Sequence, residues 1–337
     1  MIKIEVDIDK WNTIVDKHWE WFEKHLKTKF RKTNISYGMT YENFLKNELN
    51  YSISDLKKLI KIPRGCLSTY ANTSSIFYKK YIKWYHKIEN DPNKNIKDYL
   101  HNLYLCFGYS SFIEDEEKSY NFTTSLGVEV CPYCNRSYIF TSKAVQNDKT
   151  LKYICRPEID HFFPKSIFPY LSCTPANFIP SCHQCNHKKS DDYNTTDVNT
   201  HTVYPYLESF DKDSVFKLTY KDSDRKEYNI KIIYKGNKKE KNSIEAFNLE
   251  ALYNMHKIEI EDLIQRYRCY SKPKINDILK LFPNIDQSTM DNISWLITKQ
   301  MRNEILGLSL GDDSKEYPLK KFKKDLIAQF DKEAKRI

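Results

Sequence analysis

The chain has 337 residues, of which 40% are hydrophobic and 14% aromatic; this suffices for two or three domains with sizeable cores and argues against a disordered chain. Its formal net charge of +9 favours a polyanionic partner such as nucleic acid, although the Lys- and Asn-rich composition of an AT-rich genome produces the same excess. No run approaches about eighteen apolar residues, and none of the seven glycines forms a P-loop or dinucleotide-binding motif, so we expect no membrane partner and no nucleotide-binding fold.

The region 1–115 is predicted to be mainly helical. Residues 2–7, "IKIEVD", alternate apolar and polar side chains and predict a short strand. Apolar residues then recur at helical spacing over 9–30, 40–62 and 75–107, with a break at the turn sequence "NDPNKN". The start of the chain carries acidic residues and no long apolar run, so we expect no signal peptide and a reducing, cytoplasmic location.

Two Cys-x-x-Cys pairs lie in the middle of the sequence, Cys131 with Cys134 and Cys182 with Cys185. In a reducing compartment such pairs indicate a metal site rather than disulfides. Four thiolates complete the tetrahedron that zinc prefers and leave no position for water, so we predict a structural Zn²⁺ rather than a catalytic one. The remaining cysteines are interpreted as small core residues: Cys66, Cys106, Cys155, Cys173 and Cys269.

An acidic residue and a histidine, Asp160 and His161, lie between the two cysteine pairs, and Asn186 directly follows the last cysteine. The stretch "YICRPEID" predicts a strand that ends at the pair, "NFIPS" predicts a second strand, and "CHQCNHKKSDDY" predicts a turn into a helix. The cysteine cage would then bring the Asp160 carboxylate and the Asn186 amide oxygen to one gap. Such oxygen ligands suit a hard cation, Mg²⁺ or Mn²⁺, that also binds a phosphate oxygen.

His161 is the candidate general base, because an imidazole titrates near neutral pH and can take a proton from an attacking water. An isolated Asp-His pair is more often a turn or a satisfied core pair. Its position between two metal knuckles favours the catalytic interpretation. Three cations of the same segment are candidates for phosphate contacts: Lys165, Arg136 and Lys188.

Three further polar residues of the segment receive weaker predictions. His183 and His187 are weaker candidates for residues of the site. His187 is a candidate for an extra metal ligand or for a phosphate contact. Asn177 is predicted to fix its loop through hydrogen bonds from its side chain to the backbone.

The region 201–337 predicts a hairpin followed by helices. The runs "VFKLTY" and "YNIKIIY" flank the polar turn "KDSDRKE". Helical periodicity returns near 244–271, 274–282, 287–306 and 318–335. We therefore expect an α+β protein in which a zinc domain at 116–200 is inserted between the helical region 1–115 and this hairpin-plus-helices region.

Residues 131–190 resemble the HNH, or ββα-metal, endonuclease family in its four-cysteine zinc branch, and are similar to phage resolvases of the endonuclease VII type. The matching stretches are "CPYC", "EIDHFFPKS" and "NFIPSCHQCN", followed by Lys188. The resemblance implies a treble-clef-like ββα domain that cuts a phosphodiester bond through one divalent ion. Asp160 and Asn186 match the ligands of that ion, and His161 matches the base.

Two asparagines complete the comparison with the family pattern. Asn177 matches the middle Asn of the family name. Asn186 stands where the name has its last His, as in the four-cysteine branch, and this leaves the role of His187 open.

The wider layout resembles the stand-alone HNH nucleases of bacterial phage-defence operons, of the Septu-type and retron-linked kinds. That resemblance implies nucleic acid as substrate, DNA rather than RNA, and a separate ATPase or other defence subunit as partner. The alternative is a non-catalytic zinc module that binds nucleic acid or a protein. Such a binder needs the cysteines but has no use for Asp160 and His161.

Overall fold

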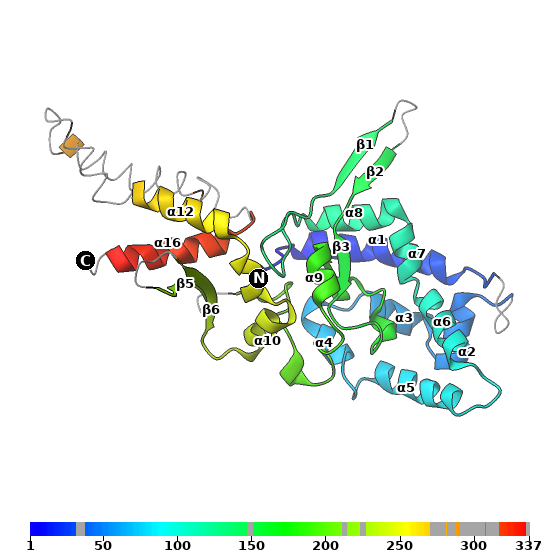
Figure 1. Cartoon of the computed structure of the whole chain (residues 1–337). Coiled ribbons are helices and arrows are strands. Elements are labelled where there is room, and N and C mark those ends of the chain that lie inside the picture. The colour runs from blue at the N-terminus through cyan, green and yellow to red at the C-terminus, as the bar shows by residue number, and fades with distance from the viewer. Residues whose placement is uncertain are drawn as a thin grey trace. The chain divides into compact units, whose positions relative to one another are not determined.

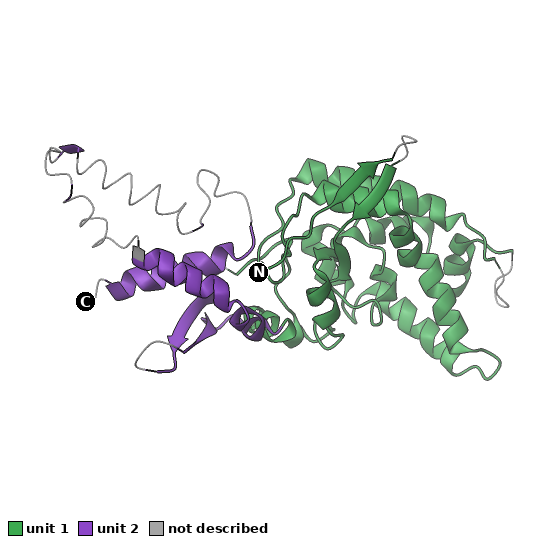
Figure 2. Ribbon diagram, turned by 45° about the horizontal axis from the view of Figure 1, so that its top comes forward, with its two compact units in different colours: residues 1–210, 238–247 green, residues 211–237, 248–337 purple. Residues whose placement is uncertain are grey.

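The computed structural model describes residues 1–31, 38–146, 151–210, 214–222, 227–269 and 317–334, together with 281, 288, 289 and 307. The chain divides into two compact units (Figure 2): residues 1–210 with 238–247, and residues 211–237 with 248–337. The predicted helical region 1–115 and the predicted zinc segment 116–200 therefore share the first unit. The helix α10 (Lys238–Ala246) belongs to that unit as well.

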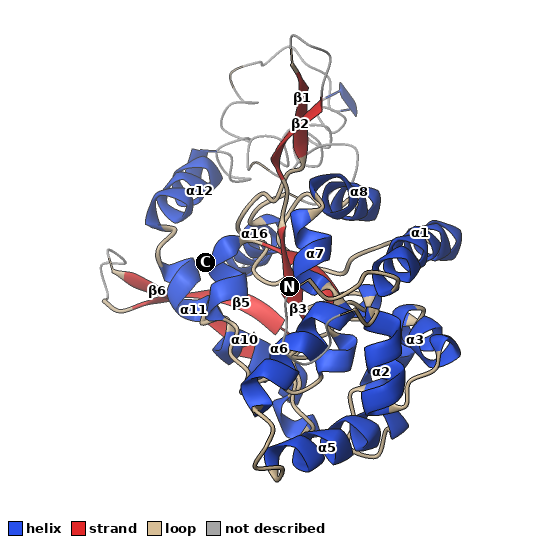
Figure 3. Ribbon diagram, turned by 90° about the vertical axis from the view of Figure 1, so that its right-hand side faces the viewer, coloured by secondary structure: helices blue, strands red, loops and turns tan. Residues whose placement is uncertain are grey.

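Helices make up most of the first unit (Figure 1, Figure 3). In chain order the early ones are α1 (Ile8–Leu26), α2 (Tyr41–Leu49), α3 (Ile53–Ile60), α4 (Leu67–Tyr70), α5 (Ile76–Glu89), α6 (Ile96–Phe107), α7 (Tyr109–Glu114) and α8 (Glu116–Leu126). The carboxylate of Asp7 caps α1 by accepting from the Lys10 amide at 2.8 Å. The buried face of α1 carries Trp11, Ile14 and Phe22 at helical spacing. The helical runs predicted for this region, including the break between α5 and α6, are confirmed.

The predicted strand at residues 2–7 is wrong, since this segment has no regular secondary structure. The Ile2 amide donates to the Pro132 carbonyl at 2.9 Å, and the Ile4 amide donates to the Pro205 carbonyl at 2.7 Å. These acceptors belong to two different segments, so no ladder with one neighbouring strand forms. The apolar alternation reflects burial, because Ile4 is 2% exposed.

Two small antiparallel sheets follow in the first unit. Strand β1 (Ser142–Val145) pairs with β2 (Leu151–Cys155), and β3 (Glu158–His161) pairs with β4 (Phe178–Ser181). The short helix α9 (His183–Lys188) comes directly after β4. The predicted continuous strand through "YICRPEID" is therefore interrupted at Arg156 and Pro157, where proline removes a ladder donor. The second predicted strand and the helix after it are confirmed.

In the second unit, the predicted hairpin is confirmed as β5 (Ser214–Tyr220) paired with β6 (Tyr228–Tyr234). Its helices are α11 (Leu249–Asn254), α12 (Lys257–Cys269) and α16 (Lys320–Ala334). Helix side chains bond to both strands: Asn254 accepts from the Ile230 amide at 2.8 Å, and Gln329 accepts from the Leu218 amide at 2.9 Å. Such contacts cover the edges of a two-stranded sheet. The helical runs predicted near 274–282 and 287–306 lie almost wholly outside the described residues.

The unpaired cysteines divide into two groups. Cys106 and Cys173 are buried, as predicted, but Cys66 and Cys155 are exposed. Cys155 ends β2, whose strand pair is mostly exposed, and Cys66 lies in a short 3₁₀ turn with no buried residue. The side chain of Cys269 lies outside the described residues.

Among the residues that the structure describes, no helix combines the length and the apolar character needed to cross a bilayer.

Candidate functional site

Four cysteine sulfur atoms meet in the first unit. The Sγ atoms of Cys131, Cys134, Cys182 and Cys185 all lie within 4.8 Å of one another, close enough to hold one metal ion. Two backbone amides point at the sulfurs, from Arg136 to Cys134 and from Cys182 to Cys131, each at 3.4 Å. Burial raises the pKa of the Cys131 thiol well above its ordinary value, so a thiolate there needs a cation beside it. Four sulfur ligands of this kind could hold a zinc ion.

A tight backbone turn shapes the first half of the cluster. The Cys131 amide donates to the Ser137 carbonyl at 3.0 Å, and the Asn135 amide donates to the Cys131 carbonyl at 2.8 Å. Asn135 has a φ of 52°, in the left-handed region that asparagine tolerates better than most residues. The turn therefore folds Cys134 back toward Cys131.

The second half of the cluster joins β4 to α9. Cys182 directly follows β4 and caps α9, while Cys185 lies buried one turn into the helix. The backbone N–H of Asn186 donates to the Cys182 carbonyl at 3.0 Å. Any ion held by these cysteines therefore ties the start of α9 to the turn at Cys131.

Asp160, on β3, is 7% exposed and has two strong partners. The Tyr133 hydroxyl donates to its Oδ2 at 2.6 Å, and the Lys189 Nζ lies 3.0 Å from the same oxygen. Lys189 also donates to the His161 carbonyl. Burial raises the pKa of Asp160 above its ordinary value, while the charge of Lys189 and the hydrogen bond from Tyr133 act in the opposite direction.

His161 is buried and held in one tautomer. Its Nε2 lies 2.7 Å from the Ser172 carbonyl, which can only accept, so Nε2 carries the proton. Among the described residues, the Nδ1 atom of His161 has no hydrogen-bond partner. This atom is not fully buried. The ring packs edge-on against Tyr109 at 4.3 Å. Burial, together with the charges of Lys165 and Lys189, lowers the pKa of His161 to about 3. The imidazole is therefore neutral at neutral pH and does not titrate there, contrary to the expectation from the sequence.

Asn186 is oriented by Glu158. Its Nδ2 donates to the Glu158 Oε2 at 2.6 Å, while the Glu158 Oε1 lies 2.6 Å from the His183 Nδ1. A carboxylate only accepts, so the amide nitrogen of Asn186 faces Glu158 and the amide oxygen is its other end. That oxygen has no hydrogen-bond partner among the residues the structure describes. Glu158 therefore sets which atom of Asn186 is available as a ligand.

Alternation along β3 separates the predicted residues into two sets. Glu158 and Asp160 lie on one face of the strand, where they contact residues of α9 and the lysine after it. His161 lies on the other face with its cross-strand partner Phe178. The structure thus places Asp160 and Asn186 along the same side of β3. That His161 and these two residues reach one phosphate remains a prediction.

Asn177 is fully buried and connects two segments of the loop before β4. Its Oδ1 accepts from the Phe163 amide at 2.7 Å, and its Nδ2 donates to the Phe163 and Leu171 carbonyls at 3.0 and 3.1 Å. These are the side chain–backbone bonds predicted for it. Leu171 directly precedes Ser172, so Asn177 also steadies the carbonyl that holds His161.

The three predicted phosphate contacts have different surroundings. The Lys165 Nζ lies 5.1 Å above the ring of Tyr109, which is the ring that packs on His161. Arg136 donates to the Gln184 side chain at 3.5 Å and so lies at α9. Lys188 is exposed near the end of α9. The structure thus brings only Lys165 beside His161.

Sequence reasoning missed Tyr133, Glu158 and Lys189. Two simple signals could have found the last two. Glu158 is two residues before Asp160 and so shares its face of a strand. Lys189 is three residues after Asn186, the spacing of neighbours on one side of a helix, whereas Lys188 is two residues after it. Nothing in the spacing distinguishes Tyr133 from an ordinary core tyrosine.

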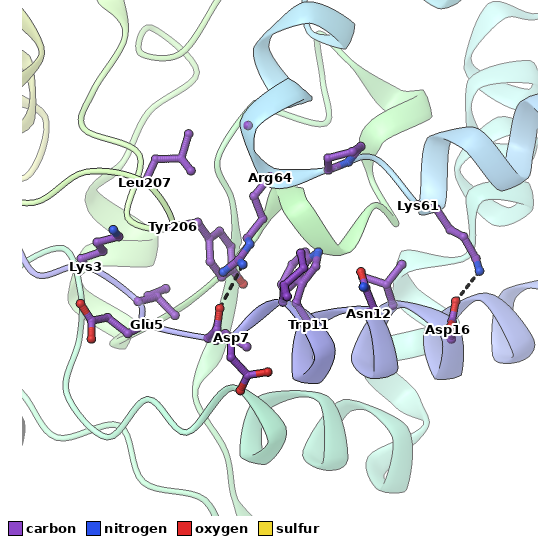
Figure 4. Close-up of a pocket in the computed structure, with 16 residues that line it drawn as sticks. Lys3, Glu5, Asp7, Trp11, Asn12, Asp16, Lys61, Arg64, Tyr206 and Leu207 are labelled. Atoms are coloured by element: carbon purple, nitrogen blue, oxygen red, sulfur yellow. Dashed lines mark hydrogen bonds and ion pairs between the residues drawn. The ribbon is translucent and has the colours of Figure 1, made fainter.

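A cavity of about 900 Å³ lies elsewhere in the first unit (Figure 4). Arg64 lies over the ring of Trp11 at 4.8 Å and donates to the Val6 carbonyl at 3.0 Å, and Lys61 pairs with Asp16 along its wall. None of the cysteine ligands, and neither Asp160 nor His161, lines this cavity. The cavity is therefore separate from the candidate site.

Comparison with known proteins gives little guidance. No family model matches the chain, and no solved structure matches it. A stretch of 59 residues is 36% identical to Protein ea31 of Escherichia phage lambda. The stretch is 18% of this chain and covers 19% of that protein, so the chain spans about a fifth of the length of this relative. Its name states no activity.

Proposed function

We propose that the chain is a metal-dependent HNH-type endonuclease that hydrolyses phosphodiester bonds, with DNA as the favoured substrate over RNA. The observation that carries the proposal is the tautomer of His161. Because Nε2 donates to the Ser172 carbonyl, the lone pair of Nδ1 is the basic end of the ring. Because the ring is neutral at neutral pH, Nδ1 is a proton acceptor for a water that attacks phosphorus.

Asp160 and Asn186 are the residues that would hold a hard divalent cation. The amide oxygen of Asn186 is turned away from Glu158, and Asp160 supplies a carboxylate on the same side of β3. Oxygen ligands of this number fit Mg²⁺ or Mn²⁺, which keep several waters and take a phosphate oxygen as a further ligand. When bound, such an ion supplies stabilisation of the charge that develops on the phosphate and on the leaving oxygen.

Two lysines lie beside these residues, one exposed and one buried. Lys189 contacts the Asp160 carboxylate and the His161 carbonyl, and the charge of Lys165 acts on the His161 ring. Lys165, which is exposed, would attract a polyanionic backbone, in keeping with the net charge of +9. A role as an effector of anti-phage defence, working beside a separate ATPase, rests on the resemblance of the sequence alone.

One observation favours a second candidate, a non-catalytic zinc module. The ion pair of Lys189 with Asp160 is 4% and 9% exposed at the two side chains, as in a structural pair that stabilises a fold. In this case the chain would bind nucleic acid or protein without cutting it.

The two candidates are separated by a cleavage assay on the full chain with its zinc bound. End-labelled plasmid, linear duplex, single-stranded DNA and tRNA would be incubated with Mg²⁺ or Mn²⁺ and, separately, with EDTA, with and without products of neighbouring genes. The nuclease predicts cleavage that needs the ion. His161→Gln, which can still donate to Ser172, should lower the rate roughly 10²–10⁴-fold. Binding without cleavage under every condition, or full cleavage by His161→Gln, would contradict the proposal.

A further inference from the structure

A second group of metal-ligating side chains lies on the surface of the first unit. Glu158 is on β3, and His183 and His187 lie one helical turn apart on α9. The nearest ligand atoms of the three all lie within 4.8 Å of one another. The two imidazole rings are 4.2 Å apart between centroids, and the Glu158 Oε1 lies 2.6 Å from the His183 Nδ1.

The composition of this group selects a particular class of cation. Two imidazoles and one carboxylate suit borderline transition ions such as Zn²⁺, Co²⁺ or Ni²⁺, whereas Mg²⁺ and Ca²⁺ prefer oxygen ligands alone. Three protein ligands leave at least one coordination position for water. The side chains are accessible to ions from solvent, since His183 is 70% and Glu158 37% exposed.

This group is distinct from the four-cysteine cluster, although both use α9. His183 and His187 are four residues apart and share one side of the helix, whereas Cys185 lies two residues from each and therefore points elsewhere. Cys185 is 1% exposed, while both histidines are exposed. An ion at the histidines therefore needs no ligand from the cysteines.

We propose that Glu158, His183 and His187 form a second metal site, which takes a transition ion such as Zn²⁺ in addition to the ion of the cysteine cluster. The ion takes the place of the hydrogen bond between the His183 Nδ1 and the Glu158 Oε1. The other oxygen of Glu158 stays on the Nδ2 of Asn186, so Asn186 is the outer-shell partner that steadies the carboxylate. The site exists whether or not the chain is a nuclease.

The test uses the full chain with zinc already bound and Co²⁺ alone as the titrant, followed by calorimetry and by visible absorption. We expect one equivalent of Co²⁺ whose binding depends on both histidines, with the weak absorption of nitrogen and oxygen ligation. His183→Ala and His187→Ala should each weaken this binding by roughly tenfold or more, at least as much as loss of an outer-shell partner does. The matched control is His86→Ala, an exposed helical histidine paired with Glu89 at 3.3 Å, which should leave Co²⁺ binding unchanged.

Two results would overturn the proposal. One is Co²⁺ binding by His183→Ala and His187→Ala equal to that of the parent chain. The other is an intense cobalt–thiolate band, which would show that the added ion had displaced zinc from the cysteines. Because both histidines are exposed, the circular dichroism of the variants should match the parent, and this confirms that lost binding is not lost folding.

Discussion

Tyr133, which lies between the two cysteines of the first metal knuckle, donates a 2.6 Å hydrogen bond to the buried carboxylate of Asp160. The ring of Tyr133 also stacks on Phe247, with centroids 4.4 Å apart. The knuckle at Cys131 and Cys134 thus does more than supply sulfur ligands. It places a hydrogen-bond donor at the candidate site and fixes that donor by packing.

Tyr133→Phe removes the donor and leaves the ring in place. Because Asp160 is buried, the loss of one of its partners should lower the free energy of unfolding by about 1–3 kcal/mol. The zinc content should stay unchanged, since the sulfur ligands are untouched. Urea unfolding at neutral pH and elemental analysis measure the two quantities. Tyr138→Phe, at a tyrosine that is 54% exposed, is the control, and an effect of equal size there would refute the argument.

Lys189→Met removes the ammonium group that pairs with Asp160. A buried carboxylate left without its cation should cost about 3–5 kcal/mol of stability at neutral pH. The penalty should shrink as the pH falls, because a protonated Asp160 needs no cation. The control is Lys188→Met on the adjacent exposed position, which should stay within about 0.5 kcal/mol of the parent. Denaturant unfolding at several pH values tests both variants, and equal effects would show that the pairing with Asp160 is unimportant.

Cys182→Ser removes one ligand of the four-sulfur cluster. Since binding of a structural zinc contributes directly to folding, the variant should lose its metal and the segment around β3, β4 and α9 should lose its protection from hydrogen exchange. Cys66→Ser, at an exposed cysteine outside the cluster, should keep both metal and protection. A Cys182→Ser protein with full zinc content would show that the ion, if present, is held differently.

The stability of the first unit should depend on pH through His18. Burial lowers the pKa of His18 to about 4, against a hydrogen bond to the Cys173 carbonyl that acts to raise it. Between about pH 6.5 and pH 4 the unfolded chain binds the proton and the folded chain does not, so stability falls as the pH is lowered through this window. By pH 4 the free energy of unfolding should have fallen by about 3 kcal/mol through His18, since each unit of pKa difference corresponds to about 1.4 kcal/mol.

His18→Gln tests this contribution, because glutamine can still donate to Cys173 but does not titrate. The slope of unfolding free energy against pH should become shallower in the variant between pH 6.5 and pH 4. Part of the slope should remain, since His161 has a pKa lowered to about 3 and acts with the same sign. An unchanged slope would mean that His18 is protonated in the folded chain or that its pKa is not shifted.

The sequence by itself determined the elements that depend on local spacing. Apolar residues at helical intervals predicted α1, α5 and α6, alternation predicted the hairpin β5–β6, and the two Cys-x-x-Cys pairs predicted a four-sulfur cluster. In each case the signal lies within a few residues of chain, because helix and strand periods and the knuckle turn are properties of the local backbone.

Only the tertiary structure decided which partners meet across the fold. Asp160 pairs with Tyr133 and Lys189, which are 27 and 29 residues away. It does not pair with Lys188, the residue directly before Lys189. Likewise, the segment 2–7 alternates like a strand but bonds to two loops. Such contacts depend on how loops close and how the core packs, and local periodicity carries no record of either.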